Sequence, residues 1–299
     1  MKLLSRNEWQ DRASKHKALV SHFSDSFLER RSVGQKHPVY DFLFTYYSFS
    51  PSKLKEWVPS FEENLEVGEE LPCLNEYWFK VEGGVLSFNP ERLQRQALSI
   101  VFIEELCNGI LERTPRFGCF GLHEWAMVYR MSELRHSDYR LRLSPDELAR
   151  FVESQNLCCT HYDAYRFFTP QAKPLNVFKP ELESRIQNEQ AGCLHANMDI
   201  YKWATKLWPW IGSDFIAKAF LNAVHGRELD MRASPYDLLE QGYTPIRIET
   251  EEGRREYQQL QLQYAKQTTS LRQELAAFCK RLREWRNHDS VCVQQMLNL

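Results

Sequence analysis

The amino-acid sequence predicts a mainly α-helical fold: a compact multi-helix domain with one small β-hairpin and a long C-terminal helix. Three observations support this prediction. Apolar residues recur every three to four positions along much of the chain. Capping residues followed by proline mark several helix starts. One segment, residues 76–88, has the composition and the central turn of a hairpin.

The helix starts are marked by a capping residue before a proline. They are Ser50-Pro51, Asn89-Pro90, Ser144-Pro145 and Ser234-Pro235. Glu147 and Asp237 stand where a capping box and its aspartate variant require an acidic residue. Together with the apolar spacing, these signals predict helices over residues 6–31, 37–47, 91–112, 122–131, 145–155, 196–207, 213–225 and 254–285.

Strand signals are few. Residues 76–81 and 85–88 flank the pair Gly83-Gly84, which predicts a hairpin. A second short strand is expected over residues 244–249. The last helix has a thin apolar stripe, so we expect residues 253–299 to pack on a helical catalytic domain formed by residues 1–252. A coiled-coil dimer arm is the alternative for that helix, with irregular heptads.

Composition and charge exclude several classes of protein. The chain has 299 residues and a formal net charge of -2, so no overall field favours nucleic acid or an anionic membrane. Its longest apolar stretches fall short of the roughly 20 residues of a membrane span, and the N-terminus turns polar before a signal-peptide core could form. The eight cysteines show no C-x-x-C pair and read as reduced, mostly buried thiols. We expect a cytoplasmic protein without a membrane partner.

Several catalytic signatures are missing from the sequence. There is no Walker loop, no dinucleotide fingerprint, no H-E-x-x-H, no G-x-S-x-G and no EF-hand. Nucleoside triphosphates, dinucleotides and serine-hydrolase chemistry are therefore not expected.

The most informative polar pattern lies between residues 193 and 202. On a helix, His195, Asp199 and Lys202 fall at i, i+4 and i+7 and share one face. Burying such a face is costly unless its groups pair with one another, with a metal or with a substrate. We expect His195 to donate to Asp199 and Lys202 to keep Asp199 ionised. A purely structural ion triad is the alternative.

A second polar pattern is surrounded by aromatic residues. His161, Asp163 and Arg166 are flanked by two aromatic pairs, Tyr162 with Tyr165 and Phe167 with Phe168. Such a site could stack a flat ring and hold a charge at its edge. An Asp163–Arg166 salt bridge on an aromatic core helix is the alternative.

Other charged residues are less easily interpreted. His123 and Arg130 would share a helical face, with Glu124 about one hundred degrees away. The alternative is an amphipathic helix with a solvated Glu124 and a surface His136. His37 and Asp41 repeat the His-x-x-x-Asp spacing. Asp237 reads as a capping residue, whereas the local sequence gives no structural role to two further charged residues, Asp230 and Arg232.

Five segments together resemble a bacterial family commonly labelled 3-methyladenine DNA glycosylase. They are residues 37–47, 119–127, 160–169, 193–202 and 229–237. The resemblance extends over nearly the whole chain. It implies hydrolysis of an N-glycosidic bond in a damaged, alkylated base or a nucleoside-like molecule, with DNA as the source of the base and no cofactor. The glycine-rich hairpin and the HEAT repeats of known helical glycosylases are absent, so no catalytic residue is carried over from them.

Base excision needs aromatic faces for the extruded base and a carboxylate beside the developing sugar cation. For this hypothesis the catalytic candidates are Asp199, His195, Asp163 and Lys202. The substrate-binding candidates are His161, Tyr165, Arg166, Trp125, Trp203 and Arg232.

Two alternatives stand beside this hypothesis. One is a metal-dependent oxygenase or hydrolase, with non-haem iron, manganese or zinc as its divalent transition metal. Its ligands would come from His123, His161, His195 and Asp199; a looser set adds His136 and Asp163. The other is a non-catalytic binding protein in which the ionic faces are internal salt bridges.

Overall fold

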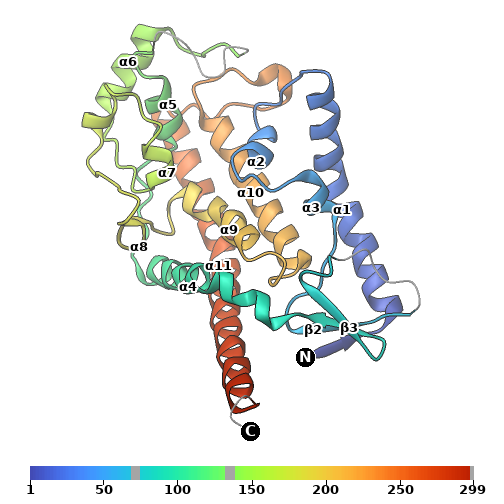
Figure 1. The fold of residues 1–299 in the computed structure, drawn as a ribbon. Helices are drawn as coiled ribbons and strands as arrows, with labels where there is room; N and C mark the ends of the chain where they lie inside the picture. Colours follow the sequence, from blue (N-terminus) through green and yellow to red (C-terminus); the bar gives the residue numbers. More distant parts are fainter. Residues whose placement is uncertain (69–74, 132–138, 297–299) are drawn as a thin grey trace. The chain divides into compact units, whose positions relative to one another are not determined.

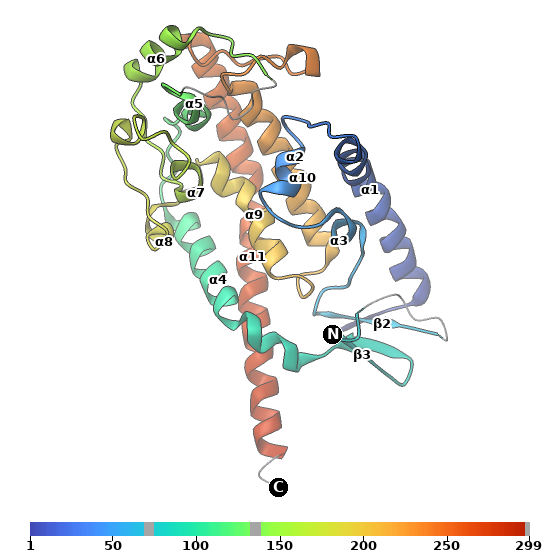
Figure 2. The same cartoon turned by 45° about the horizontal axis from the view of Figure 1, so that its top comes forward.

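The computed structural model confirms a mainly helical fold with a long C-terminal helix (Figures 1 and 2). It describes residues 1–68, 75–131 and 139–296, with side chains up to residue 286. The contacts divide the chain into two compact units. Unit 1 comprises residues 1–105, 200–221 and 274–299, and unit 2 comprises residues 106–199 and 222–273. Among the described residues, no helix is long and apolar enough to cross a membrane.

Unit 1 contains all of the elements from β1 to η1. They are β1 (Lys2–Leu4), α1 (Arg6–Ser32), α2 (Asp41–Thr45), α3 (Pro51–Lys55), β2 (Glu63–Glu66), β3 (Phe79–Glu82), β4 (Val85–Phe88) and the 3-10 helix η1 (Pro90–Gln96). The α1 helix begins where its sequence predicts, because Ser5 and Glu8 form a capping box.

The sheet of unit 1 has the order β1-β2-β4-β3. Strands β3 and β4 form the predicted hairpin, with Phe79 opposite Phe88, around two glycines that both have positive φ. Strand β2 is antiparallel to β4, and β1 is parallel to β2. The last two pairings were not predicted, because strands of three and four residues carrying several charges show no apolar alternation.

The predicted helix over residues 37–47 is wrong in its first turn, since α2 begins only at Asp41. Nδ1 of His37 instead accepts the N–H groups of Val39 and Tyr40, and Asp41 accepts the N–H of His37 and pairs with Arg30. His37 and Asp41 therefore do not form a second i, i+4 pair on a helix.

Unit 2 contains α5 (Leu122–Val128), α6 (Pro145–Ser154), α7 (Tyr162–Tyr165), η2 (Lys173–Leu175), α8 (Arg185–Asn188) and η3 (Leu239–Gln241). The boundary between the units falls within α4 (Ala97–Glu112), α9 (Leu194–Lys206), α10 (Ser213–Ala233) and α11 (Glu251–Met296).

Two predictions on the C-terminal side of α10 are wrong. Ser234-Pro235 begins no helix, because α10 runs on to Ala233 and the Ser234 hydroxyl donates to a carbonyl of that helix. Residues 244–249 form no strand. Ile246 and Ile248 are instead fully buried in a loop, and the Ile246 N–H donates to the carbonyl of Arg232.

Within unit 2, the helices α9, α10 and α11 pack closely around Gly226. A Cβ at this position of α10 would lie 2.5 Å from Cγ of Met198 and 2.5 Å from the hydroxyl of Tyr264. The neighbouring Asn222 connects the three helices. Its side-chain amide donates a hydrogen bond to the backbone carbonyl of Asn197, and its backbone carbonyl accepts one from the Tyr264 hydroxyl. These contacts fix the two helices that carry His195 and Asp230.

We expect Gly226→Ala to lower the free energy of unfolding by about 1–3 kcal/mol in urea titrations, because overpacking outweighs the better helix propensity of alanine. Gly68→Ala is the matched control, since its Cβ would meet only the end of the flexible Arg6 side chain at 3.3 Å. A Gly226→Ala protein as stable as wild type would show that the three helices pack less tightly than described.

Candidate metal site

The site is organised by a buried ion pair on α10. Asp230 is 0 % exposed and Arg227, one helical turn earlier, is 2 % exposed. Nη1 of Arg227 donates to Oδ2 of Asp230 at 2.6 Å and to Oε1 of Glu124 at 2.8 Å. The alternative with a solvated Glu124 is therefore wrong. Its charge is buried because Arg227, 103 positions later in the chain, meets it inside the protein.

Two histidines face the carboxylate of Asp230. Nε2 of His123, on α5, lies 2.8 Å from Oδ1 of Asp230, yet neither atom has a hydrogen-bond partner among the described residues. Nε2 of His195, on α9, lies 4.0 Å from Oδ2. One ligand atom from each of the three residues lies within 4.8 Å of the other two. Three ligand atoms this close together could hold one metal ion.

The protonation states suit a metal ion. Burial lowers the pKa of His195 well below its usual value, and the nearby His123 adds to this effect. Burial raises the pKa of Asp230, but His123, His195 and Arg227 outweigh it, so that the pKa of Asp230 is lowered. A neutral imidazole and an ionised carboxylate are the forms that bind divalent metals.

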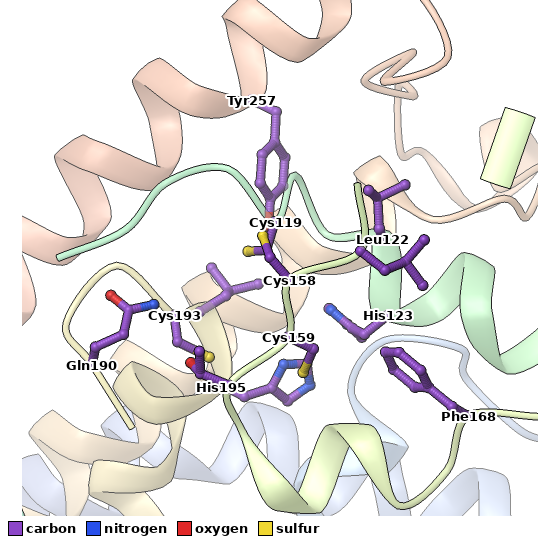
Figure 3. A pocket seen from close by; sticks show the side chains of 13 residues that line it. Cys119, Leu122, His123, Cys158, Cys159, Phe168, Gln190, Cys193, His195 and Tyr257 are labelled. Atoms are coloured by element: carbon purple, nitrogen blue, oxygen red, sulfur yellow. The ribbon is translucent and has the colours of Figure 1, made fainter. Parts of the chain in front are cut away.

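The two histidines open onto a narrow pocket of unit 2 (Figure 3). Four cysteine side chains also line the pocket, and its apolar lining includes Leu122, Leu157 and Phe168. The four cysteines of the pocket are Cys119, Cys158, Cys159 and Cys193. Burial raises the pKa of Cys158 to about 11 and that of Cys159 to about 12, so these thiols are neutral near pH 7.

The pocket is small. The volume open to the centre of a water molecule is about 20 Å³, and one water needs roughly 10–15 Å³ on this measure. The space beside the histidines therefore accommodates one or two water-sized molecules.

A second ionic cluster lies around His161, which caps α7 by accepting the Ala164 N–H at Nδ1. Its Nε2 lies 3.3 Å from Oδ2 of Asp199 and 3.6 Å from Oε1 of Glu189. The expected partner of Asp199 was His195, four residues earlier on the same helix. The structure instead pairs Asp199 with His161, and His195 faces Asp230.

Arginines complete this second cluster. Arg185, itself 5 % exposed, donates to Asp163, and its Nε lies 3.8 Å from Glu189. Arg166 also pairs with Asp163 at 3.3 Å, as the salt-bridge alternative predicts. Burial lowers the pKa of His161, but the charges of Glu189 and Asp199 outweigh it and raise that pKa overall.

The other predicted residues are not among those that line the pocket. Lys202 lies over the rings of Tyr46 and Trp203, and Trp203 packs edge-on against Phe102. Trp125 is fully buried, and its indole N–H donates to the carbonyl of Ala233. Three further residues also contact protein groups: Tyr165 with Lys173, Arg166 with Phe167, and Arg232 with Thr244. His136 lies outside the described residues.

The sequence therefore predicted two of the three clustered residues, His123 and His195, but not their partner. Asp230 stood out only as a charge without a local role. Arg227 was missed, although an arginine three residues before Asp230 on one helix was a readable signal.

Comparisons with models of protein families, with curated proteins and with solved structures find no match for this chain.

We expect Arg227→Met to lower the free energy of unfolding by about 3–5 kcal/mol, because it leaves two buried carboxylates without their cation. Urea unfolding at pH 7.5 measures this effect. The exposed pair of Arg281 and Glu62 provides the control, since Arg281→Met should cost less than about 1 kcal/mol. Equal losses in the two variants would contradict the account of the buried pair.

The two histidines 161 and 195 should affect stability in separate pH windows. Below about pH 6.5 the unfolded chain binds a proton at His195 that the folded protein excludes, so stability falls with falling pH. His161 has the opposite shift, so its contribution is complete below about pH 6.5 and is lost as the pH rises above that value.

In metal-free protein, we therefore expect the free energy of unfolding to fall by up to about 1.4 kcal/mol per pH unit below pH 6.5 through His195. His195→Gln should reduce the dependence of the free energy of unfolding on pH below pH 6.5. His161→Gln should reduce that dependence above pH 6.5. Unfolding curves at half-unit steps from pH 5 to pH 8.5 test both, and unchanged slopes would contradict the assignments.

Proposed function

We propose that this protein is a metal-dependent enzyme in which His123, His195 and Asp230 hold one divalent transition metal ion. The observation that carries the proposal is the meeting of their three ligand atoms within 4.8 Å in a buried position. Nε2 of His123 and Oδ1 of Asp230 lie 2.8 Å apart, but not in hydrogen-bond geometry, and a bound ion would satisfy both atoms.

Arg227 supports this assignment by orienting the carboxylate. Its bond to Oδ2 of Asp230 fixes the carboxylate and leaves Oδ1 for the ion. Partners of this kind hold metal ligands in position and tune their affinity. The ion would have three protein ligands and open positions for a substrate or a small ligand.

The donor set favours oxidation chemistry on non-haem iron(II). Two histidines and one carboxylate with open positions are typical of iron(II) oxygenases, although zinc hydrolases use related sets. A hydrolase also needs a base to activate its water, and no carboxylate is among the described residues that line the pocket. We therefore favour an oxygenase over a hydrolase.

The base-excision hypothesis stays a prediction. Its proposed carboxylates, Asp199 and Asp163, belong to the second ionic cluster and do not line the pocket. A purine is much larger than the one or two water molecules for which the pocket has space. Base binding would require this pocket to open or another surface to be used.

We expect protein purified without a histidine tag to contain about one equivalent of iron, manganese or zinc by elemental analysis, iron being favoured. Asp230→Ala and His123→Ala should each lower metal affinity by more than about tenfold, because a lost ligand costs more than a lost supporting contact. His225→Ala is the control: His225 is exposed and lies on the same helix as Asp230.

Equal metal content in Asp230→Ala and in His225→Ala would overturn the proposed site. So would metal-free protein that takes up no added ion. Release of alkylated purines from DNA by such metal-free protein, lost in Asp199→Asn, would favour base excision instead.

A further inference from the structure

Two residues that line the pocket carry buried hydroxyl groups without a hydrogen-bond partner among the described residues. These groups are Oη of Tyr257, on α11, and Oγ1 of Thr160, just before α7. Tyr257 is 0 % exposed and Thr160 is 6 % exposed. Neither group takes part in the ion pairs around Asp230 or His161, so the proposed metal site does not yet explain them.

The surroundings of Tyr257 place its side chain among the residues that line the pocket. Figure 3 shows Tyr257 extending from its helix towards Cys119 and the other labelled residues that line the pocket. Gly121 makes room for the Tyr257 hydroxyl, because a Cβ there would lie 3.2 Å from the oxygen. Gly121 also has a φ of +71° and caps α5, two residues before His123. The same short turn thus positions a metal ligand and admits the phenol.

An unsatisfied buried hydroxyl costs free energy, and a pair of them in one pocket indicates a bound polar ligand. The ligand must be small, since the space holds only one or two water-sized molecules. It must also accept hydrogen bonds, because burial raises the pKa of Tyr257 and keeps the phenol a donor. The nearby thiols are weak donors and compete little.

We propose that Tyr257 and Thr160 form the binding site for a diatomic ligand of the metal ion, with dioxygen as the natural one. This inference rests on the proposed metal site. The ion would bind one atom of the ligand from the histidine side of the pocket. The two hydroxyls would donate to the ligand as its negative charge grows on coordination, as preorganised donors do in other enzymes.

Nitric oxide is a suitable probe, because it binds iron(II) in place of dioxygen. We expect iron(II)-loaded protein, prepared without oxygen, to bind about one nitric oxide per iron, as seen by electron paramagnetic resonance. Tyr257→Phe and Thr160→Val should each weaken this binding about fivefold, the effect of one lost hydrogen bond. Both should also raise the N–O stretching frequency in the infrared spectrum, which a merely structural role would not change.

Tyr264→Phe is the matched control. Tyr264 is also a buried tyrosine of α11, but its hydroxyl donates to the carbonyl of Asn222 at 2.9 Å and does not line the pocket. Iron content should be the same in all three variants and in the wild type. Nitric oxide affinity and N–O frequency should change only in the two pocket variants.

Wild-type protein that binds no iron would overturn the metal site itself. Protein that binds iron normally but takes up no nitric oxide, or takes it up equally in the pocket variants and the control, would overturn this inference alone. If Tyr257→Phe fails to fold, Thr160→Val decides the question, because valine keeps the β-branched shape and replaces only the hydroxyl with a methyl group.

Discussion

The complete burial of the Asp230 carboxylate is the constraint on which unit 2 depends. One cation, Arg227, faces two buried carboxylates, those of Asp230 and Glu124. A charge that is buried without full compensation costs several kcal/mol, so a single arginine leaves the cluster short of positive charge. His195 does not reduce this deficit, because burial lowers its pKa well below the usual value and keeps it neutral. A divalent ion bound by the histidines and Asp230 would supply the missing charge and would give the buried carboxylate a function.

Side chains of helix α11 form hydrogen bonds to the chain segment that carries His195. Within unit 2, Gln261 donates to the carbonyl of Gly192, and the buried Arg272 donates to the carbonyl of Ala196 and to the Asn197 side chain. These bonds fix the chain on both sides of His195 at the start of α9. The same helix carries Tyr257 into the pocket. In the proposed site, one helix would thus position both a metal ligand and the hydroxyl that contacts the bound diatomic molecule.

Local sequence signals predicted much of the fold, because helix caps and turns depend on neighbouring residues. Ser144 and Glu147 mark the start of α6 as a capping box should, and Gly83-Gly84 form the predicted hairpin turn. The site was predicted only in part, because its pairs join residues that are distant in sequence. The spacing of His195 and Asp199 suggested that they pair, yet each meets a residue from another segment. No local pattern reveals that Glu124 meets an arginine 103 positions later.

The central claim is that His123, His195 and Asp230 share one metal ion. A crystal of the protein grown with iron(II) or cobalt(II), measured on both sides of the absorption edge of that metal, tests it most directly. The account predicts one anomalous peak in unit 2, about 2.0–2.2 Å from a nitrogen of each histidine and from Oδ1 of Asp230. No peak between these three side chains, or a peak held by other residues, would contradict it.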